Sequence, residues 1–326
     1  MCNDHCSVAL VIVNWNSGDW LRRCLHGLAC QTVQPERVLL VDNYSTDSSL
    51  AGIEEILPTV EIIRETENLG FAKANNIALG GIVNSQWTVL LNPDAVPEPD
   101  WLENLIHATQ NHLDYTFFAC KMLDATEPSL LDGTGDVYHT SGHAWRQGFG
   151  RDSQIEGEVT AECFSPCAAA AMYRTDILKQ VAGFDERFFC YFEDVDLGFR
   201  LRLLGHRCLY VPEAVVAHAG SASTMKRSNF SVYYGHRNMI WTYFKNMPWP
   251  LFWIYLPQHI LLNVVSVFVL SLRGQGRVAF CAKYDAIKSL RYVLKDRRLI
   301  QKNRQVSFLD LRRSMSKGVG QLLERN

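Results

Sequence analysis

The feature that most constrains the fold is an alternation of apolar runs and helical patterns, repeated four times in about the first 110 residues. The apolar runs are short and rich in β-branched residues, as is typical of buried strands: Val8–Val13, Arg37–Asp42, Val60–Arg64 and Trp87–Leu91. A helical pattern or a helix-capping segment follows each run: residues 18–31, Ser45–Asp47, Phe71–Leu79 and Asp100–Gln110. The alternation predicts an α/β fold, a mainly parallel sheet with helices on both faces.

Polar segments follow three of the predicted strands. They are Asn14-Trp15-Asn16, Asp42-Asn43 and Asn92-Pro93-Asp94. In open α/β sheets, ligands bind in the crevice outside the carboxyl ends of the strands. The three segments are therefore expected to line one binding site.

Beyond residue 123 the pattern is less regular. Residues 124–162 are rich in Gly, Thr, Ser and His and are interpreted as loops or a hairpin. The small, apolar stretch Cys163–Tyr173 precedes Thr175, a candidate helix cap. A helix is expected over Asp194–Leu204, and short strands over Cys208–Val211 and Val215–His218.

Asp42 and the residues after it suggest nucleotide recognition. A carboxylate at this strand end can accept a hydrogen bond from a pyrimidine N3–H or a ribose hydroxyl, although Asp42 and Asp47 are also ordinary turn-capping residues. A second cluster lies at the start of the third predicted helix, where Gly70 permits a sharp turn, Lys73 could meet a phosphate and Asn76 follows on the helix.

Asn92 and Asp94 suggest a cation site. A carboxylate at a strand end beside a nucleotide can hold Mg²⁺ or Mn²⁺, which prefer hard oxygen ligands. His218 ends an apolar strand and is a second candidate ligand. The structural alternatives are a proline turn capped by Asp94 and a buried, hydrogen-bonded histidine.

Three carboxylates follow a strongly aromatic run and open a predicted helix: Glu193, Asp194 and Asp196. An apolar wall beside Glu193 or Asp194 would raise the pKa of that carboxyl group and prepare it to act as a general base. Asp196 is equally explained as a favourable charge at a helix N-terminus.

Charge divides the chain into two regions. Residues 1–224 carry 14 Lys and Arg against 30 Asp and Glu, whereas residues 225–326 carry 18 against 4. The ten cysteines form no C-x-x-C pair, and no basic segment precedes the short apolar run Val8–Val13. These features predict a reducing, cytoplasmic compartment. A domain at 1–224 and a basic and apolar helical region at 225–326 are expected.

The second region contains 27 consecutive residues without Lys, Arg, Asp or Glu, from Asn246 to Leu272. Pro248, Pro250 and Pro257 interrupt this run, aromatic residues cluster at its start, and 14 basic residues follow it. An interfacial or re-entrant pair of helices on an anionic membrane surface is the favoured interpretation. A single membrane span and a soluble core or dimer helix are the alternatives.

Five blocks, taken in order, resemble glycosyltransferase family 2, whose members have the GT-A fold, and in particular its rhamnosyltransferase-like branch. They are NWNSGDW, VDNYSTDSS, NLGFAKANN, LLNPDAVPEPDWL and the stretch from Gly183 to His218. The resemblance covers about residues 8–245. It implies a Rossmann-like, mainly parallel sheet, a nucleotide-diphospho-sugar donor and an acceptor that is often lipid-linked.

The resemblance also implies roles for single residues. Asp42 matches the acid that reads the nucleotide base, with Asn14, Asn16 and Asn43 nearby. Asp94 matches the last acid of the D-x-D metal motif, and Asn92 replaces its first acid. Asp194, within the Glu193-Asp194 pair, matches the catalytic base, and His218 matches a metal-binding histidine.

The expected function is inverting, metal-dependent transfer of a sugar, L-rhamnose from dTDP-rhamnose as the best guess, to a lipid-linked or polysaccharide-precursor hydroxyl. A dTDP- or UDP-sugar donor and a peripheral position on the cytoplasmic face of a membrane complete this expectation. The main alternative is a catalytically impaired nucleotide-sugar-binding protein. A nucleotidyltransferase is less favoured because the first strand end lacks a basic phosphate loop, and the apolar run argues for lipid rather than nucleic acid as the partner of the basic region.

Overall fold

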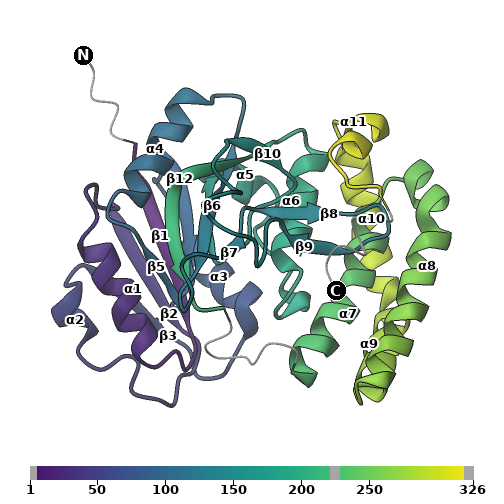
Figure 1. Ribbon diagram of the computed structural model, residues 1–326, viewed down its shortest axis with the longest axis horizontal. Helices are drawn as coiled ribbons and strands as arrows, with labels where there is room; N and C mark the ends of the chain where they lie inside the picture. Colours follow the sequence, from purple (N-terminus) through teal and green to yellow (C-terminus); the bar gives the residue numbers. More distant parts are fainter. Residues whose placement is uncertain (1–5, 221–227, 319–326) are drawn as a thin grey trace.

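A ten-stranded mixed sheet forms the centre of the molecule in the computed structural model, which describes residues 6–220 and 228–318 (Figure 1). Four parallel strands fill one half, namely β1 (Val8–Asn14), β2 (Arg37–Asp42), β3 (Val60–Arg64) and β4 (Trp87–Leu91). The other half contains β11 (Ala170–Arg174), β6 (Phe117–Asp124), β12 (Cys208–His218) and β10 (Ala161–Cys163). Strand β11 is antiparallel to both β4 and β6, and β12 runs parallel to β6.

Shorter strands extend this half of the sheet. Strand β5 (Ala95–Pro97) pairs with β12, and β7 (Leu131–Gly133) pairs with β6. A separate hairpin is formed by β8 (Asp136–Tyr138) and β9 (Ala144–Arg146). The region expected to contain loops or a hairpin therefore supplies short strands beside the carboxyl end of β12.

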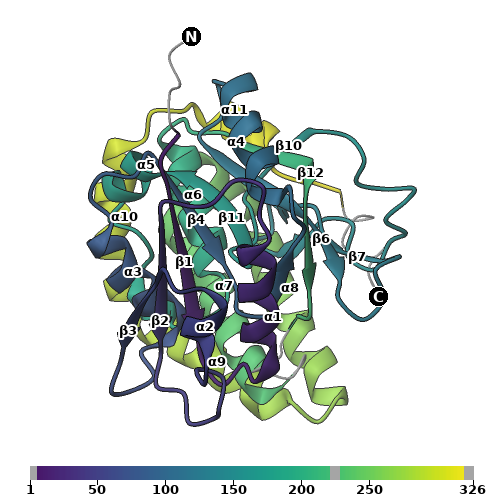
Figure 2. The ribbon, with the colours of Figure 1, turned by 90° about the vertical axis from the view of Figure 1, so that its left-hand side faces the viewer.

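Helices cover both faces of the sheet, as the sequence predicts (Figure 2). On one face lie α1 (Asp19–Ala29), α2 (Ile53–Ile56) and α4 (Trp101–Asn111), and on the other lie α3 (Gly70–Gly81), α5 (Thr175–Gln180) and α6 (Glu193–Leu203). Successive side chains of a strand point to opposite faces. In β1, Leu10 and Ile12 therefore join the α1 face, and Val11 and Val13 join the α3 face.

The C-terminal helices form a layer beside the sheet, on the right of Figure 1. They are α7 (Asn229–Asn246), α8 (Trp249–Leu272), α9 (Gly276–Lys288), α10 (Leu290–Asn303) and α11 (Phe308–Arg313). Their apolar residues share one buried cluster with the body: Tyr243 and Leu251 pack with Tyr138 of β8 and Phe199 of α6. The layer is thus continuous with the core of the sheet domain.

Two local predictions were wrong. The helix expected from Ser45 does not form there, because residues 43–52 make a loop and α2 begins only at Ile53. The two short strands expected before His218 are a single strand, β12, whose register shifts between Val211 and Val215. The irregularity explains the break in the apolar pattern without ending the strand.

Helix α8 is continuous over 24 residues and contains Pro257. By length and composition it could cross a membrane, with a mean hydropathy of 1.6, and only 6% of that window is buried in the protein. Pro257, one of the prolines expected to interrupt the apolar run, lies inside the helix without ending it.

Candidate active site

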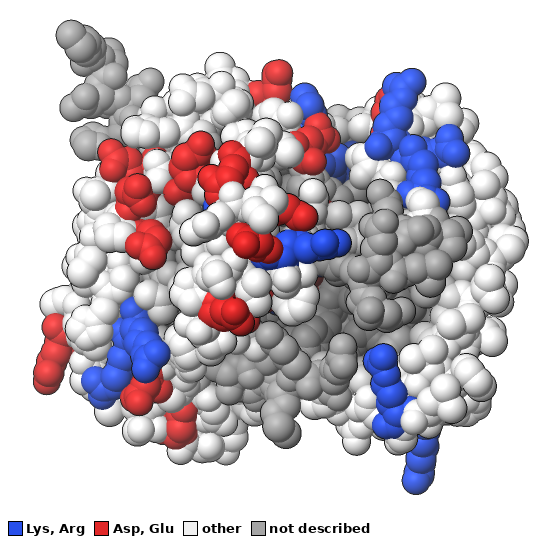
Figure 3. Space-filling view, in the orientation of Figure 1, with Lys and Arg blue, Asp and Glu red and all other residues white. Residues whose placement is uncertain are grey.

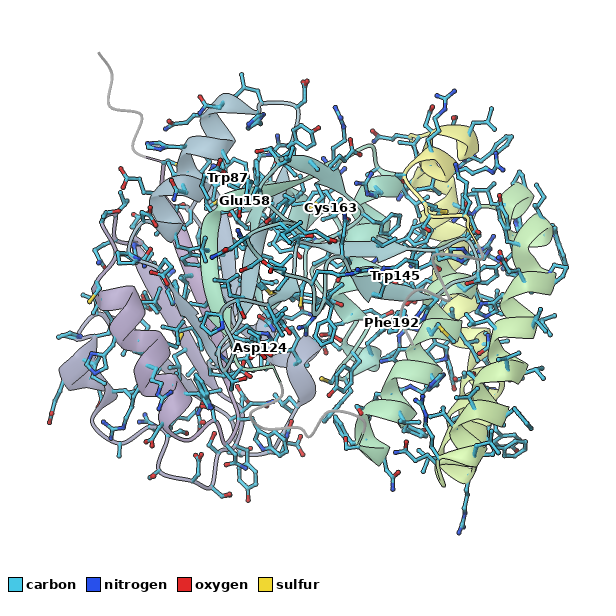
Figure 4. All side chains as sticks on the ribbon, in the orientation of Figure 1. Trp87, Asp124, Trp145, Glu158, Cys163 and Phe192 are labelled. Carbon is cyan, nitrogen blue, oxygen red and sulfur yellow. The ribbon has the colours of Figure 1, made fainter. Side chains whose placement is uncertain are left out.

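A cleft with a volume of about 320 Å³ opens at the carboxyl ends of the parallel strands. Its walls come from the ends of β1, β2, β4 and β12, the start of α6 and the β8–β9 hairpin. Six groups that can carry charge line it: Asp94, Asp136, Arg146, Glu193, Asp194 and His218. Trp145 and Phe192, two further lining residues, lie between the sheet and the C-terminal helices in Figure 4.

The first wall contains the expected nucleotide-binding segments. Asn14 and Asp42 end the neighbouring strands β1 and β2 in register, and Asn14 Nδ2 donates to Asp42 Oδ1 over 3.1 Å. Asn43 lines the cleft; its Oδ1 accepts a hydrogen bond from the Leu69 backbone N–H. Asn14 is fully buried and Asn16 Oδ1 accepts from the Thr46 backbone N–H. These two asparagines hold the strand ends and the following loop, behind the cleft surface.

Of the three site residues expected on helix α3, one lines the cleft and two are not among its lining residues. Gly70 lines the cleft with φ of 78°, and a Cβ built on it would lie 2.5 Å from the Phe189 ring. Asn76 lines a different surface pocket. Its Nδ2 donates a hydrogen bond to Phe184 O and its Oδ1 accepts one from the Phe184 backbone N–H, each over 2.8 Å. Lys73 is not among the residues that line the cleft, so its contact with a phosphate stays a prediction.

Asn92, Asp94 and His218 meet on the second wall. Asp94 follows β4 and His218 ends β12, and the distance from His218 Nε2 to Asp94 Oδ1 is 3.4 Å. His218 Nδ1 is bonded to Asp132 Oδ2 at 2.7 Å. Burial by itself lowers the pKa of His218, but the bonds to Asp132 and Asp94 outweigh burial and raise the pKa above its usual value.

Asp136 and Arg146 are cleft residues that the sequence reasoning missed, as it missed Asp132, which is buried behind the cleft surface. Asp132 of β7 joins His218 to Arg146 of β9, because its carboxylate bonds both side chains. Asp132, Asp136 and Arg146 lie on strands of three residues, which are too short to show the alternation of apolar and polar residues that marks a strand. The available signal was the acid pair in Asp132-Gly133-Thr134-Gly135-Asp136, inside a region interpreted as loops.

The third wall carries Glu193 and Asp194 at the start of α6. Glu193 is 5% exposed, and no described residue is hydrogen-bonded to its Oε2 atom. Asp194 accepts hydrogen bonds from the backbone N–H groups of Ala168 and Val195. Burial raises the pKa of both carboxyl groups, and for Glu193 the neighbouring charge of Asp194 adds to the increase. The raised pKa makes either carboxylate a stronger base than an exposed carboxylate, and the two neighbouring groups titrate as a pair.

Asp94 and His218 fit a divalent cation that is shared with a phosphate ligand. The part of the chain that the structure describes holds no group of three or more His, Cys, Asp or Glu that could bind a metal alone. Mg²⁺ is commonly held by one or two protein groups together with substrate phosphates. The bond from Asp132 to Nδ1 leaves Nε2 of a neutral His218 facing Asp94, which is the orientation a metal-binding imidazole needs.

The fold and cleft define the class of protein as a GT-A glycosyltransferase, with acids and a histidine gathered at the ends of a mainly parallel sheet. A family model described as "Glycosyltransferase like family 2" matches residues 5–238, and the chain belongs to this family. The family resemblance stated from the five sequence blocks is therefore confirmed, and the chain is a glycosyltransferase.

A curated relative and two solved structures support this assignment. The N-acetylglucosaminyl-diphospho-decaprenol L-rhamnosyltransferase of Mycobacterium tuberculosis is 29% identical over 245 residues, covering 66% of this chain and 76% of that protein. S. aureus TarS 1-349 in complex with UDP-GlcNAc has a TM-score of 0.56 at 17% identity, covering 90% of this chain and 92% of that one. The mannosyltransferase PcManGT from Pyrobaculum calidifontis, in complex with GDP-Man and Mn²⁺, has a TM-score of 0.54 at 16% identity, covering 90% and 84%. The two structures confirm the predicted GT-A fold.

Proposed function

We propose that this glycosyltransferase moves a sugar from a nucleotide-diphospho-sugar to a hydroxyl group of a lipid-linked saccharide, with inversion at the anomeric carbon. L-rhamnose from dTDP-rhamnose is the first candidate donor, because the Mycobacterium tuberculosis relative is named as an L-rhamnosyltransferase for a diphospho-decaprenol-linked sugar. The observation that carries the proposal is one cleft with Asp94 and His218 on one wall and Glu193 and Asp194 on another.

The donor is proposed to bind along the wall formed by β1, β2 and β4. Asn43, which lines the cleft, would face the base and ribose. Asp42 is buried beside it and accepts a hydrogen bond from Asn14, so its contact with the base stays a prediction. Asp94 and His218 would hold Mg²⁺ or Mn²⁺, with Asn92 beside them as a neutral residue. When bound, the cation supplies positive charge that stabilises the departing nucleoside diphosphate.

Asp194 is the proposed base. It takes the proton from the acceptor hydroxyl, and the oxygen attacks the anomeric carbon on the side opposite the diphosphate. The new C–O bond forms while the bond to the diphosphate breaks, so one displacement inverts the configuration. Burial raises the pKa of Asp194 and so its proton affinity, while the pKa of Glu193 is raised by burial and by the neighbouring charge of Asp194.

Replacing each acid in turn tests the assignment of the base. We expect Asp194→Asn to lower kcat by about 10²–10⁴-fold, the usual contribution of general-base catalysis, with donor affinity by calorimetry within about threefold of wild type. Asp100→Asn, at an exposed position, serves as the matched control. A larger loss in Glu193→Gln than in Asp194→Asn would move the role of base to Glu193.

Assays of donor binding and sugar transfer distinguish an active enzyme from a catalytically impaired nucleotide-sugar-binding protein. Binding of dTDP-rhamnose or a UDP-sugar that is strengthened by Mn²⁺, together with sugar transfer, supports the enzyme. Binding without transfer to any hydroxyl acceptor, or without hydrolysis of the donor, supports a nucleotide-sugar-binding protein in which Asn92 marks lost metal chemistry.

We also propose that residues 1–224 carry the catalytic and metal-binding side chains and that residues 225–326, besides packing against them, hold the protein on the cytoplasmic face of a membrane. The outer side of α8 is apolar, with Trp253, Val264 and Phe268 more than 60% exposed. In Figure 3 the right-hand side of the molecule, over α8, is mostly uncharged, with Lys and Arg above and below it and acidic groups over the sheet. An apolar strip with basic flanks suits the interface of an anionic bilayer.

A further inference from the structure

The turn that leads into Glu193 has an unusual backbone. Phe189, Tyr191 and Phe192 have φ of 65°, 67° and 66°, a region that side chains other than glycine rarely adopt. Phe189 has ψ of −64°, and the Cys190 N–H donates to Phe188 O over 2.8 Å, which makes Phe189 the centre of a γ-turn of the rare, strained kind. Each such residue costs about 1–3 kcal/mol, so the surrounding structure must hold the turn in place.

Asn238 of α7 supplies that restraint. Its side chain is fully buried, and its amide nitrogen lies 2.9 Å from Phe188 O, 2.9 Å from Cys190 O and 2.7 Å from Tyr191 O. The two amide hydrogens of Asn238 are thus shared among three backbone carbonyl oxygens of the turn, which lies outside any regular helix or strand.

Arg237 completes the restraint. Its guanidinium donates to Arg187 O at 2.9 Å, to Phe188 O at 3.0 Å and to Asn238 Oδ1 at 2.9 Å. The same group lies 4.2 Å from the Trp241 ring centroid and 4.7 Å from that of Tyr234, so its own position is fixed by aromatic contacts. One turn of α7 therefore binds the backbone of residues 187–191.

The restrained turn forms part of the cleft. Phe189, Cys190, Tyr191 and Phe192 line it, and Glu193 and Asp194 follow without an intervening residue. Across the cleft, Phe189 O accepts a hydrogen bond from Ala72 N–H of α3, and the Phe189 ring closes against Gly70. Any relaxation of the turn would move the aromatic wall and the two carboxylates together.

We propose that Asn238, supported by Arg237, is a positioning residue for sugar transfer: it holds the Phe188–Phe192 turn and so fixes where the Glu193–Asp194 carboxylates stand in the cleft. This inference rests on the proposed function, since the carboxylates matter only if one of them deprotonates the acceptor. It gives the C-terminal helices a part in catalysis that is separate from any membrane binding.

The test compares Asn238→Ala with Val232→Ala in the full chain. Val232 lies on the same helix and packs against Leu270 of α8 and Ala279 of α9, away from the turn. We expect Asn238→Ala to lower kcat about 10²-fold, as a displacement of about 1 Å does, while donor KM and nucleoside diphosphate affinity stay within about threefold. Val232→Ala should keep wild-type kcat.

The pH profile distinguishes positioning from loss of folded protein. Opening the turn admits water to Glu193 and Asp194, so the acid limb of kcat should move to lower pH in Asn238→Ala. Other groups also act on this pair, and the substitution alters none of them: Asp136 of β8, Arg146 of β9, Tyr173 of β11, Asp196 of α6 and the thiols of Cys167 and Cys190. Reduced folding alone would lower the amount of activity without moving the limb.

Arg237→Met keeps the proposal testable if Asn238→Ala does not fold. This variant removes two donors to the turn but leaves Asn238, so a smaller fall of about tenfold in kcat, again with unchanged donor KM, is expected. The proposal is overturned if the folded variants keep kcat within threefold of wild type, or if kcat and donor affinity fall together with the acid limb unmoved. The proposed function fails separately if wild-type protein transfers no sugar.

Discussion

At the residue scale, Gly70 shows why a position in a sequence block can be restricted without touching a substrate. Its φ of 78° and the 2.5 Å approach of Phe189 leave no room for a Cβ. We expect Gly70→Ala to lower the free energy of unfolding by about 1–3 kcal/mol and to reduce kcat, because Phe189 and the turn before Glu193 must move. Urea unfolding and sugar-transfer assays measure the two effects.

Gly80 provides the matched control for Gly70. It lies on the same helix, with nothing within 4 Å of a built Cβ. Gly80→Ala is therefore expected to raise the free energy of unfolding by about 0.5–1 kcal/mol, the usual gain for a helical glycine. Equal effects of the two substitutions would show that the contact with Phe189 does not restrict residue 70.

The carboxyl pair makes a second prediction, about pH. Burial raises the pKa of Glu193 and Asp194 above the usual range of an exposed carboxyl group, so the pair keeps a proton as the pH falls and cannot then serve as a base. Turnover at saturating substrate should therefore rise with pH, with an acid limb that lies above the usual carboxyl range of about pH 4 and belongs to the pair rather than to one residue. A kcat profile whose limb lies in that usual range, measured where the protein stays folded, would contradict this assignment.

Much of the site could be anticipated because its residues directly follow predictable strands. Asp42, Asp94 and His218 each end or closely follow a predicted apolar strand, and parallel topology brings such ends together. Asp132 and Arg146 could not be found this way, because they lie on strands of three residues, which are too short to show an alternating apolar pattern. The role of Asn238 was equally hidden, since it acts on the backbone of residues 188–191.

At the element scale, α6 and α7 are joined by a buried ion pair network. Lys245 Nζ lies 2.8 Å from Asp196 Oδ2 and 2.6 Å from Asp185 Oδ2, with all three side chains less than 10% exposed. Removing one partner of a buried pair costs about 3–5 kcal/mol. We expect Lys245→Met to lower the free energy of unfolding by an amount near the lower end of that range, because Arg187 and Arg200 still contact the two acids.

The same network sets an acid dependence of stability. Burial alone would raise the pKa of Asp185, but Arg187 and Lys245 outweigh it and hold the pKa well below its usual value. A lowered folded-state pKa stabilises the protein above the unfolded value of about 3.8, and this contribution is lost as pH falls below it. In Lys245→Met the free energy of unfolding should fall less steeply with decreasing pH. Lys295→Met, at an exposed position, is the control: it should change the free energy of unfolding by less than about 0.5 kcal/mol and keep the wild-type dependence on pH.

The helices were predicted correctly where the apolar pattern along the sequence extended over several turns. Helices α1, α3 and α4 lie within two residues of the expected bounds, because each presents an apolar side over three or more turns. The failed helix after Ser45 has another cause. The side chain of Asn16 caps the backbone N–H of Thr46, so a contact from the β1 end stabilises a loop that local sequence alone reads as a helix start.

At the scale of the whole molecule, the C-terminal helices have two roles: their inner side supports the cleft, and their exposed side forms part of the outer surface. Their inner side shares a buried cluster with β8 and α6 and restrains the turn at Phe188–Phe192. Deleting them would uncover that cluster, so membrane binding cannot be tested cleanly by truncation. Substitutions on the exposed side of α8 change only the surface that would meet lipid.

The last prediction concerns this surface. We expect the full chain to float with vesicles containing anionic phosphatidylglycerol, more weakly with neutral phosphatidylcholine vesicles, and less at high salt, because each basic group near an anionic surface contributes about 1 kcal/mol. Replacing Val264 and Phe268 of α8 by Glu should lower partitioning at least tenfold, since each apolar side chain contributes about 1.5–3 kcal/mol when buried. Val83 and Leu113, equally exposed on the sheet body, give the matched control, and their replacement by Glu should leave flotation unchanged. If both pairs of substitutions leave flotation equal to that of the wild type, or if the protein never floats, α8 is not the membrane-binding surface.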